Sequence, residues 1–190
     1  MRSKTPYHSV RITEDELPLV VAMFREGDRD AFRRLYDHFE CPIFRFCRHI
    51  LSDEAMAGDA FQETFIRMYQ HHRDIRTLNI QSWPYSIARR VCLNLLRSQR
   101  STVESFNEDL HGGAVSPTGD VFLREHLDKA MSQLPITLRE ALVLRDVEGH
   151  SYQEIAVICG IDLSLAKVRV FRARQHMRHM LTHVVSERGR

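Results

Sequence analysis

Long hydrophobic runs and paired cysteine motifs are both missing from the sequence. No part of its 190 residues supplies the roughly 18–20 consecutive apolar residues of a membrane-spanning helix. The N-terminus runs into acidic residues instead of the apolar core of a secretory signal. The 4 cysteines form no CxxC pair, and their spacing matches no common zinc pattern. We therefore expect no membrane insertion, and we interpret the cysteines as reduced core thiols of a cytoplasmic protein.

Catalytic signatures are missing as well. The chain has no glycine-rich phosphate loop, no GxSxG and no HExxH motif, and spacing alone supports no convergent pair of carboxylates. His176, His179 and His183 are spaced to share one helix face, but we interpret this as a coincidence on the surface. We expect no catalytic residue, no cofactor and no metal. A sensor that binds metal or reacts through the histidines or cysteines remains an alternative.

A strong net charge is also lacking, since the formal total is only +2. Taken alone, this value argues against a nucleic-acid-binding protein. The charges are segregated, however: residues 83–100 carry four arginines and no acid, residues 101–120 carry four acids and no base, and residues 163–190 carry seven bases and one acid. Two blocks of +4 and +6 are what attraction to a polyanion requires.

Almost every segment with hydrophobic periodicity in the first half of the chain has the period of a helix. Pro42 lies inside one helical pattern and predicts a kink or a join between two helices. Ser52 is the expected N-cap of the third helix and Ser82 that of the fourth. The predicted helices are Glu14–Glu26, Ala31–Leu51, Asp53 to about His72, and Trp83 to about Gln99, with a loop over residues 73–81.

The second half is predicted to be helical too. A helix over about Val121–Gln133 ends at Pro135, and a final helix covers about Leu163–Val184. Between them, two Ser/Thr-x-x-Glu patterns, Thr137–Glu140 and Ser151–Glu154, predict capping boxes that each begin a helix. Gly149 and Gly160 stand where helices end.

These elements predict an all-α protein of two small helical domains joined by a flexible linker. Residues 101–120 concentrate the Gly-Gly, Ser-Pro and Thr-Gly pairs and hold few large apolar residues, which is typical of a linker. We accordingly place one domain at residues 1–100 and the other at residues 121–190.

The clearest local pattern is a helix-turn-helix at Ser151–Arg174. A short capped helix ends at Gly160, a tight turn follows, and a longer basic helix begins near Ser164. We expect Ile155, Val170 and four further apolar residues to hold the two helices together (Ala156, Ile161, Leu165 and Val168). In this motif the N-terminal part of the second helix enters the major groove of DNA. Its basic residues are Lys167, Arg169, Arg172 and Arg174.

Two further patterns have alternative interpretations. In Trp83–Arg100, two aromatic residues, Trp83 and Tyr85, precede arginines that include Arg89, Arg90 and Arg97. Aromatic and basic side chains together suit single-stranded DNA, but a buried tryptophan beside solvated arginines would give the same sequence.

On the third predicted helix, Asp59, Gln62, Glu63 and Arg67 share a polar face that we place opposite Phe61 and Phe65. This face is either a partner-binding surface or simply a solvated one.

Four segments in this order resemble the extracytoplasmic-function (ECF) sigma factors of bacteria. GDRDAFRRLYDHF and DEAMAGDAFQETFIRMYQ are similar to parts of the family's region two, and SWPYSIARRVCLNLLR is similar to its Trp-Leu…Ile-Ala-Arg helix. The segment LPITLREALVLRDVEGHSYQEIAVICGIDLSLAKVRVFRARQHM is similar to region four. The resemblance covers about residues 20–185. It implies an alternative sigma factor that binds core RNA polymerase and directs promoter-specific initiation.

The resemblance also implies roles for individual residues. Asp59, Gln62, Glu63 and Phe65 match the segment that binds the β′ coiled coil of core polymerase, and the β flap is a second expected contact. The loop Asp74–Gln81 matches the part that recognises and opens the minus-ten element, together with Trp83, Tyr85, Arg89, Arg90 and Arg97. The minus-thirty-five element would be contacted by the recognition helix through Lys167, Val168, Arg169, Phe171, Arg172 and Arg174. An anti-sigma factor is a further expected partner.

The sequence departs from the family pattern at two places. Pro84 follows Trp83, where the family usually has leucine, and Ser164-Leu165-Ala166 replaces the common Gly-Thr-Val. These differences leave the class unchanged, but they prevent a prediction of the promoter sequence. Two rival functions are a stand-alone helix-turn-helix regulator, for which Asp59–Phe65 would have no use, and a sigma mimic that sequesters an anti-sigma factor.

Overall fold

The computed structural model describes residues 12–13, 15–75, 80–103 and 119–187, and every regular element in these ranges is helical. The all-α prediction is therefore confirmed for the described part of the chain. An N-terminal unit contains α1 (Leu17–Arg25), α2 (Arg29–Leu51), α3 (Glu54–Gln70), the short 3₁₀-helix η1 (His72–Asp74) and α4 (Trp83–Val103). A C-terminal unit contains α5 (Gly119–Gln133), α6 (Ile136–Leu142), the π-helical turn η2 (Val143–Val147), α7 (Tyr152–Cys159) and α8 (Leu163–Glu187).

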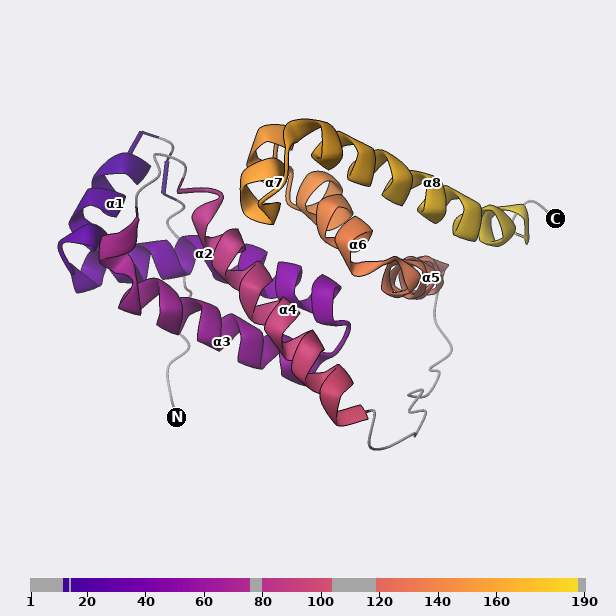
Figure 1. Cartoon of the computed structure of the whole chain (residues 1–190), viewed down its shortest axis with the longest axis horizontal. Coiled ribbons are helices and arrows are strands. Elements are labelled where there is room, and N and C mark those ends of the chain that lie inside the picture. Colours follow the sequence, from indigo (N-terminus) through magenta and orange to yellow (C-terminus); the bar gives the residue numbers. More distant parts are fainter. Residues whose placement is uncertain (1–11, 14, 76–79, 104–118, 188–190) are drawn as a thin grey trace.

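The two units lie side by side (Figure 1). Helices α1–α4 form one end of the molecule, while α6 and α7 lie next to α2 and α4 and α8 runs along the outer edge of the C-terminal unit. A single apolar cluster extends from Phe24, Phe39 and Phe46 in the N-terminal unit to Leu144 and Ile155 in the C-terminal unit. Residues 104–118, most of the predicted linker, lie outside the described residues.

Helix α2 continues through Pro42, so a join between two helices at this position is a wrong prediction. A proline inside a helix lacks one backbone hydrogen bond. Buried side chains on both sides of it, Phe39, Ile43 and Phe46 among them, keep the two parts of α2 on the same core. Apolar burial over the full length of the helix offsets that local loss.

The boundary between α2 and α3 differs by one residue from the prediction. Ser52 does not cap α3; it ends α2 in the left-handed conformation, with φ at 57°. The N-cap is Asp53, whose Oδ1 accepts a hydrogen bond from the Met56 amide at 2.7 Å. A serine in the left-handed region cannot supply the extended backbone that an N-cap requires, so the neighbouring aspartate takes this position.

The two predicted capping boxes have different outcomes. Ser151 and Glu154 form the reciprocal box at the start of α7. The box at Thr137–Glu140 is wrong, because α6 begins at Ile136 after Pro135 and has no side-chain cap. Glu140 is buried instead and binds arginines from two other helices. Tertiary partners therefore override the local pattern at this position.

Three of the cysteines, Cys47, Cys92 and Cys159, are buried free thiols, as predicted. Cys41 lies exposed on α2, so its assignment to the core is wrong. Among the described residues, no group of His, Cys, Asp and Glu side chains is arranged to hold a metal ion. No helix in the described ranges is long and apolar enough to cross a membrane.

Candidate functional site

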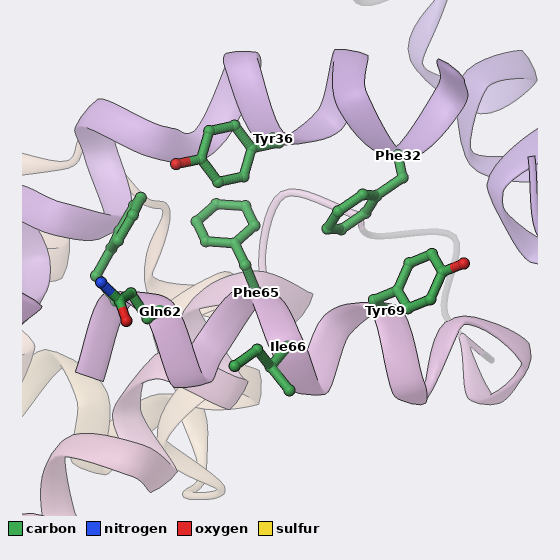
Figure 2. Close-up of a pocket in the computed structure, with 7 residues that line it drawn as sticks. Phe32, Tyr36, Gln62, Phe65, Ile66 and Tyr69 are labelled. Carbon is green, nitrogen blue, oxygen red and sulfur yellow. The ribbon is translucent and has the colours of Figure 1, made fainter. Parts of the chain in front are cut away.

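An open apolar groove lies between α2 and α3 (Figure 2). Its volume is about 430 Å³. Tyr36 packs on Phe65 with ring centroids 4.6 Å apart, and Phe32 packs edge-on against Tyr69 at 5.1 Å. Ile66 and Tyr69 remain 50% and 41% exposed. The lining residues are Phe32, Tyr36, Phe61, Gln62, Phe65, Ile66 and Tyr69.

The structure brings the four predicted polymerase-binding residues to this part of α3, but in different situations. Asp59 and Gln62 are exposed, and Gln62 lines the groove. The Glu63 carboxylate accepts a hydrogen bond from Arg67 Nε at 2.6 Å. Phe65 is buried against Tyr36. Gln62 thus shares the groove with the two phenylalanines that the sequence interpretation had placed on the opposite face.

The exposed apolar rim was not found from the sequence. Ile66 and Tyr69 lie outside the buried stripe of α3, which is formed by small residues and by Phe65 and Met68. Residues 65–69, FIRMY, could have indicated this rim, because they contain more large apolar residues than a single buried helix face can hold. Exposed apolar patches of this kind typically mark interaction sites.

On α4, the predicted minus-ten residues do not share one free surface. Trp83 is half-buried and packs against Phe24, with ring centroids 6.4 Å apart. Arg90 and Arg97 are exposed. Tyr85 and Arg89, in contrast, face the C-terminal unit. In the preceding loop, residues 76–79 lie outside the described residues.

Tyr85 is buried between Phe46 of α2, on which its ring packs edge-on with centroids 5.5 Å apart, and the C-terminal unit. Its hydroxyl donates a hydrogen bond to Glu148 Oε2 at 2.9 Å, and its ring packs edge-on against His150 with centroids 4.4 Å apart. Burial and the adjacent Glu148 carboxylate raise the pKa of Tyr85. Arg45 Nε and Nη2 donate to the same carboxylate at 2.7 and 2.8 Å. Glu148 thus joins α2 and α4 to the C-terminal unit.

Glu140 binds one arginine from each unit. Arg89 donates to its two oxygens from Nε and Nη2 at 2.7 and 3.0 Å, and Arg169 Nη1 donates at 3.2 Å. The thiol of Cys159 lies beside this cluster, where burial and the Glu140 carboxylate raise its pKa to about 12. Arg89 and Arg169 therefore share the Glu140 carboxylate as their hydrogen-bond acceptor.

The helix-turn-helix forms as predicted from α7, a turn and α8. Gly160 ends α7 with φ at +66°, a conformation that favours glycine. Asp162 Oδ1 then accepts a hydrogen bond from the Leu165 amide at 2.8 Å. Hydrogen bonds from Ser164 and from backbone amides lower the pKa of Asp162.

The helices of this motif pack through a slightly different set of residues than expected. Ile155 and Val170 are buried, as predicted. Leu165 and Val168 are exposed, and the packing position between them is taken by Ala166. A small residue there lets α8 approach its neighbours closely.

The outer face of α8 is basic and apolar at once. Lys167, Val168, Phe171 and Arg172 are all exposed, Phe171 by 62%. Arg174 binds Asp146 through Nε at 3.0 Å. Because Asp146 binds Arg174, fewer basic side chains of this face are available to a partner than the sequence alone suggests.

Comparisons with known proteins agree with this architecture. Residues 35–102 match the family model Sigma-70 region 2, and residues 124–177 match Sigma-70, region 4. The chain is 31% identical over 172 residues to the RNA polymerase sigma factor CarQ of Myxococcus xanthus, covering 88% of this chain and 98% of CarQ. It is 29% identical to the ECF RNA polymerase sigma factor SigM of Bacillus subtilis, covering 80% of this chain and 96% of SigM.

Two solved structures share the fold. The sigma factor RpoE of Bartonella quintana, determined with the anti-sigma factor NepR, aligns with a TM-score of 0.70 at 24% identity over 80% of this chain and 96% of that one. CnrH, determined with the cytosolic domain of CnrY, aligns with a TM-score of 0.69 at 20% identity over 87% of this chain and 96% of that one.

Helical units that match sigma regions 2 and 4, in the order of the family, define a sigma factor. The chain belongs to the extracytoplasmic-function RNA polymerase sigma factors. It is an alternative sigma factor that binds core RNA polymerase and directs initiation at specific promoters. Members of this family are in general not enzymes.

Proposed function

We propose that the groove between α2 and α3 binds the β′ coiled coil of core RNA polymerase. The observation that carries this proposal is the open apolar surface of about 430 Å³, because an amphipathic helix binds such a groove through its apolar face. Asp59 and Gln62 flank the apolar residues and would fix the register of the incoming helix. Phe65 would support the groove from below, since it is buried.

For the minus-ten element, the proposed surface is the loop Asp74–Gln81 with Trp83, Tyr85, Arg89, Arg90 and Arg97. The exposure of Arg90 and Arg97 supports a role in neutralising the phosphates of an unpaired strand. Tyr85 and Arg89 would join this surface after leaving the C-terminal unit.

For the minus-thirty-five element, the proposed surface is the exposed face of α8. Lys167 and Arg172 would contact phosphates or guanine edges, and Val168 and Phe171 would contact apolar base edges in the major groove. Arg169 and Arg174 would contribute only after leaving Glu140 and Asp146.

Family membership supports the remaining assignments. Residues 1–100 would form region two, residues 101–120 the linker and residues 121–190 region four, which would contact the β flap. The protein would act in the cytoplasm, where core polymerase is found, and would perform no chemistry itself. An anti-sigma factor is a further partner, in keeping with the RpoE–NepR complex.

A pull-down with core polymerase tests the groove. The double variant Gln62→Ala/Glu63→Ala should recover about tenfold less polymerase than the wild type, which corresponds to about 1.4 kcal/mol of binding free energy. A matched control is Glu125→Ala/Gln133→Ala, which changes the same two residue types at exposed positions of α5. Equal recovery by both variants would reject the groove as the polymerase-binding site.

A further inference from the structure

A small basic pocket lies at the end of α1, where this helix meets the 3₁₀-helix η1. Its volume is about 220 Å³, and its described lining residues are Arg25, Glu26 and Arg73. The two arginines are far apart in the sequence, and both are exposed. Neither belongs to the basic blocks at residues 83–100 and 163–190. The fold therefore brings together two positive charges that the charge pattern of the sequence does not connect.

Both guanidinium groups are without a partner among the described residues: neither Arg25 nor Arg73 donates a side-chain hydrogen bond to one of them or forms an ion pair with one. Arg34 of α2, in contrast, forms an ion pair at 3.0 Å. Arg25 does not cap α1 either, because the carbonyl oxygens at the end of this helix accept from the amides of Gly27 and Asp28 at 2.9 and 3.2 Å. The planar N–H groups of both arginines thus remain available to a ligand.

Packing between α1 and η1 holds the walls of this pocket in place. Phe24, which precedes Arg25, is fully buried and packs on the His72 ring with centroids 5.9 Å apart. The His72 ring is oriented by a hydrogen bond from Nδ1 to the carbonyl oxygen of Tyr69 at 2.7 Å. Gly27 has φ at +88°, and a Cβ atom there would lie 3.7 Å from His72 Nε2. The backbone of each arginine is therefore positioned before a ligand arrives, which lowers the entropic cost of binding.

Two guanidinium groups at one pocket suit a phosphate group. Arginine binds two phosphate oxygens at once, and such charge-assisted hydrogen bonds are about twice as strong as neutral ones. Sites that enclose a cofactor or a drug-sized ligand measure about 300–1,000 Å³. A pocket of about 220 Å³ is smaller than this and suits one phosphate group of a longer polymer.

The position of the pocket indicates which polymer would supply the phosphate. Arg73 directly precedes the loop Asp74–Gln81 in the sequence. Phe24, next to Arg25, also packs against Trp83 with ring centroids 6.4 Å apart. The loop and Trp83 belong to the proposed minus-ten surface. Single-stranded DNA binds where aromatic rings stack on its bases and neighbouring basic groups follow its backbone, so the pocket lies beside the proposed path of an unpaired strand.

We propose that Arg25 and Arg73 together bind one backbone phosphate of the unpaired promoter strand. This inference rests on the proposed function, because it extends the path of the same strand from α4 to the end of α1. Glu26 explains why the ligand is a phosphodiester: two arginines and one carboxylate give the lining a net charge of +1. This charge matches the single negative charge of a phosphodiester, whereas a phosphate monoester carries about −1.5 to −2 at neutral pH.

The salt dependence of strand binding tests the site in the full-length protein. The probe is a fluorescent, random-sequence, single-stranded DNA of about 20 nucleotides. Arg25→Ala and Arg73→Ala should each weaken binding about tenfold. Each should also reduce the slope of log affinity against log salt by about 0.7, the value for one phosphate of a single strand. Because both arginines bind the same phosphate, the double variant should lose little more than either single variant.

Two matched variants separate this site from a general loss of charge. Arg33→Ala removes one positive charge from an exposed position of α2 outside the pocket and should leave the slope unchanged. Glu26→Gln removes the carboxylate of the pocket and should strengthen binding, by up to about fivefold. Circular dichroism checks that every variant remains helical.

The proposal is overturned if Arg25→Ala and Arg73→Ala behave like Arg33→Ala. It is also overturned if the slope change of the double variant equals the sum of the two single changes, because the arginines would then bind separate phosphates.

Inorganic phosphate distinguishes a DNA strand from a free ligand. Added to the wild type and the labelled strand, it should displace the strand no better than chloride at the same ionic strength. Displacement at micromolar phosphate that is lost in the double variant would assign the pocket to a free phosphate and overturn its assignment to DNA.

A failure of the proposed minus-ten surface gives a different result, which Arg90→Ala/Arg97→Ala measures with the same probe. If this pair weakens strand binding and the Arg25 and Arg73 variants do not, the pocket is rejected and the minus-ten surface is supported. If the Arg25 and Arg73 variants alone weaken it, the pocket is supported and the proposed role of Arg90 and Arg97 is rejected. If neither pair weakens it, both proposals are rejected.

Discussion

The two faces of the N-terminal unit that we propose to be functional differ in their exposure and in the contacts they make. The face between α2 and α3 is apolar and open, with Ile66 and Tyr69 exposed beside buried aromatic rings. The face of α4 that meets the C-terminal unit is covered and combines apolar packing with polar contacts, in which Tyr85 and Arg89 bind buried carboxylates. Among the described residues the rim of the apolar groove stays exposed, whereas an arginine can exchange a carboxylate for a phosphate. The first face is therefore exposed, whereas the second is covered by the C-terminal unit.

The largest expected effect separates the base of the groove from its rim. Phe65→Ala removes a buried ring that packs on Tyr36 and Phe61, and such a truncation costs about 3–5 kcal/mol of unfolding free energy. Tyr69→Ala, at the exposed rim, should cost much less. Urea unfolding followed by circular dichroism measures both. Similar losses at the two positions would mean that the groove is not divided into a structural base and an exposed rim.

A polar substitution at the rim should affect binding without affecting the fold. Ile66→Asp places a charge where an apolar helix face would have to pack. We expect about a tenfold loss in affinity for core polymerase, or about 1.4 kcal/mol, with a nearly unchanged melting temperature. Leu19→Asp is the control, because Leu19 is also a large apolar residue exposed at the surface, on α1. If Leu19→Asp weakened binding as much, the groove would have no special role.

The covered face should respond to pH through His150. Burial lowers the pKa of His150 even though Glu154 and Glu148 are nearby, and its ring packs on Tyr85. His150 therefore binds a proton more readily in the unfolded chain than in the folded chain. Stability is retained above the ordinary histidine pKa of about 6.5 and is lost as the pH falls below it.

Unfolding experiments across this pH range measure the effect. His150→Gln should flatten the loss of stability between about pH 7 and pH 5. Part of the dependence should remain, because burial also lowers the pKa of His49. An identical pH dependence in the variant and the wild type would assign the effect to His49 or to other groups.

The smallest expected effect concerns the ion pair between Arg174 and Asp146. Both side chains are substantially exposed, and exposed pairs contribute about 0.2–1 kcal/mol. Asp146→Asn should therefore change the unfolding free energy by no more than this amount. It should also free Arg174 and slightly strengthen binding of the protein to double-stranded DNA. Weaker DNA binding would show that Asp146 positions Arg174 for DNA instead of competing with it.

Much of the fold could be predicted because its signals are local. Helical periodicity, the Ser151–Glu154 capping box and the glycine turn at Gly160 each depend on residues a few positions apart. The sigma-factor resemblance depended on such local segments occurring in order. Predictions were wrong where another interaction outweighed the local pattern. Asp53, and not Ser52, is the N-cap of α3. Pro42 did not divide α2, because apolar burial holds that helix together.

The candidate site was predictable only in part. Sequence alone predicted that α3, α4 and α8 contact partners, which remains a prediction, and it identified the polar residues of these helices. It could not show that Ile66 and Tyr69 stay exposed, because the sequence pattern of an apolar residue is the same at the rim of a groove as in a buried core.

The sequence by itself determined which segments become helices, the helix-turn-helix and the membership of a family. Only the tertiary structure decided what those residues contact. Glu140 shows the difference most clearly: its spacing from Thr137 predicts a helix cap, yet the folded chain brings Arg89 and Arg169 to its carboxylate. A cap depends on neighbours within one helical turn, whereas the partner of a buried charge is selected by packing between helices that are distant in the sequence. That selection places a single carboxylate between the two regions that we propose to bind DNA.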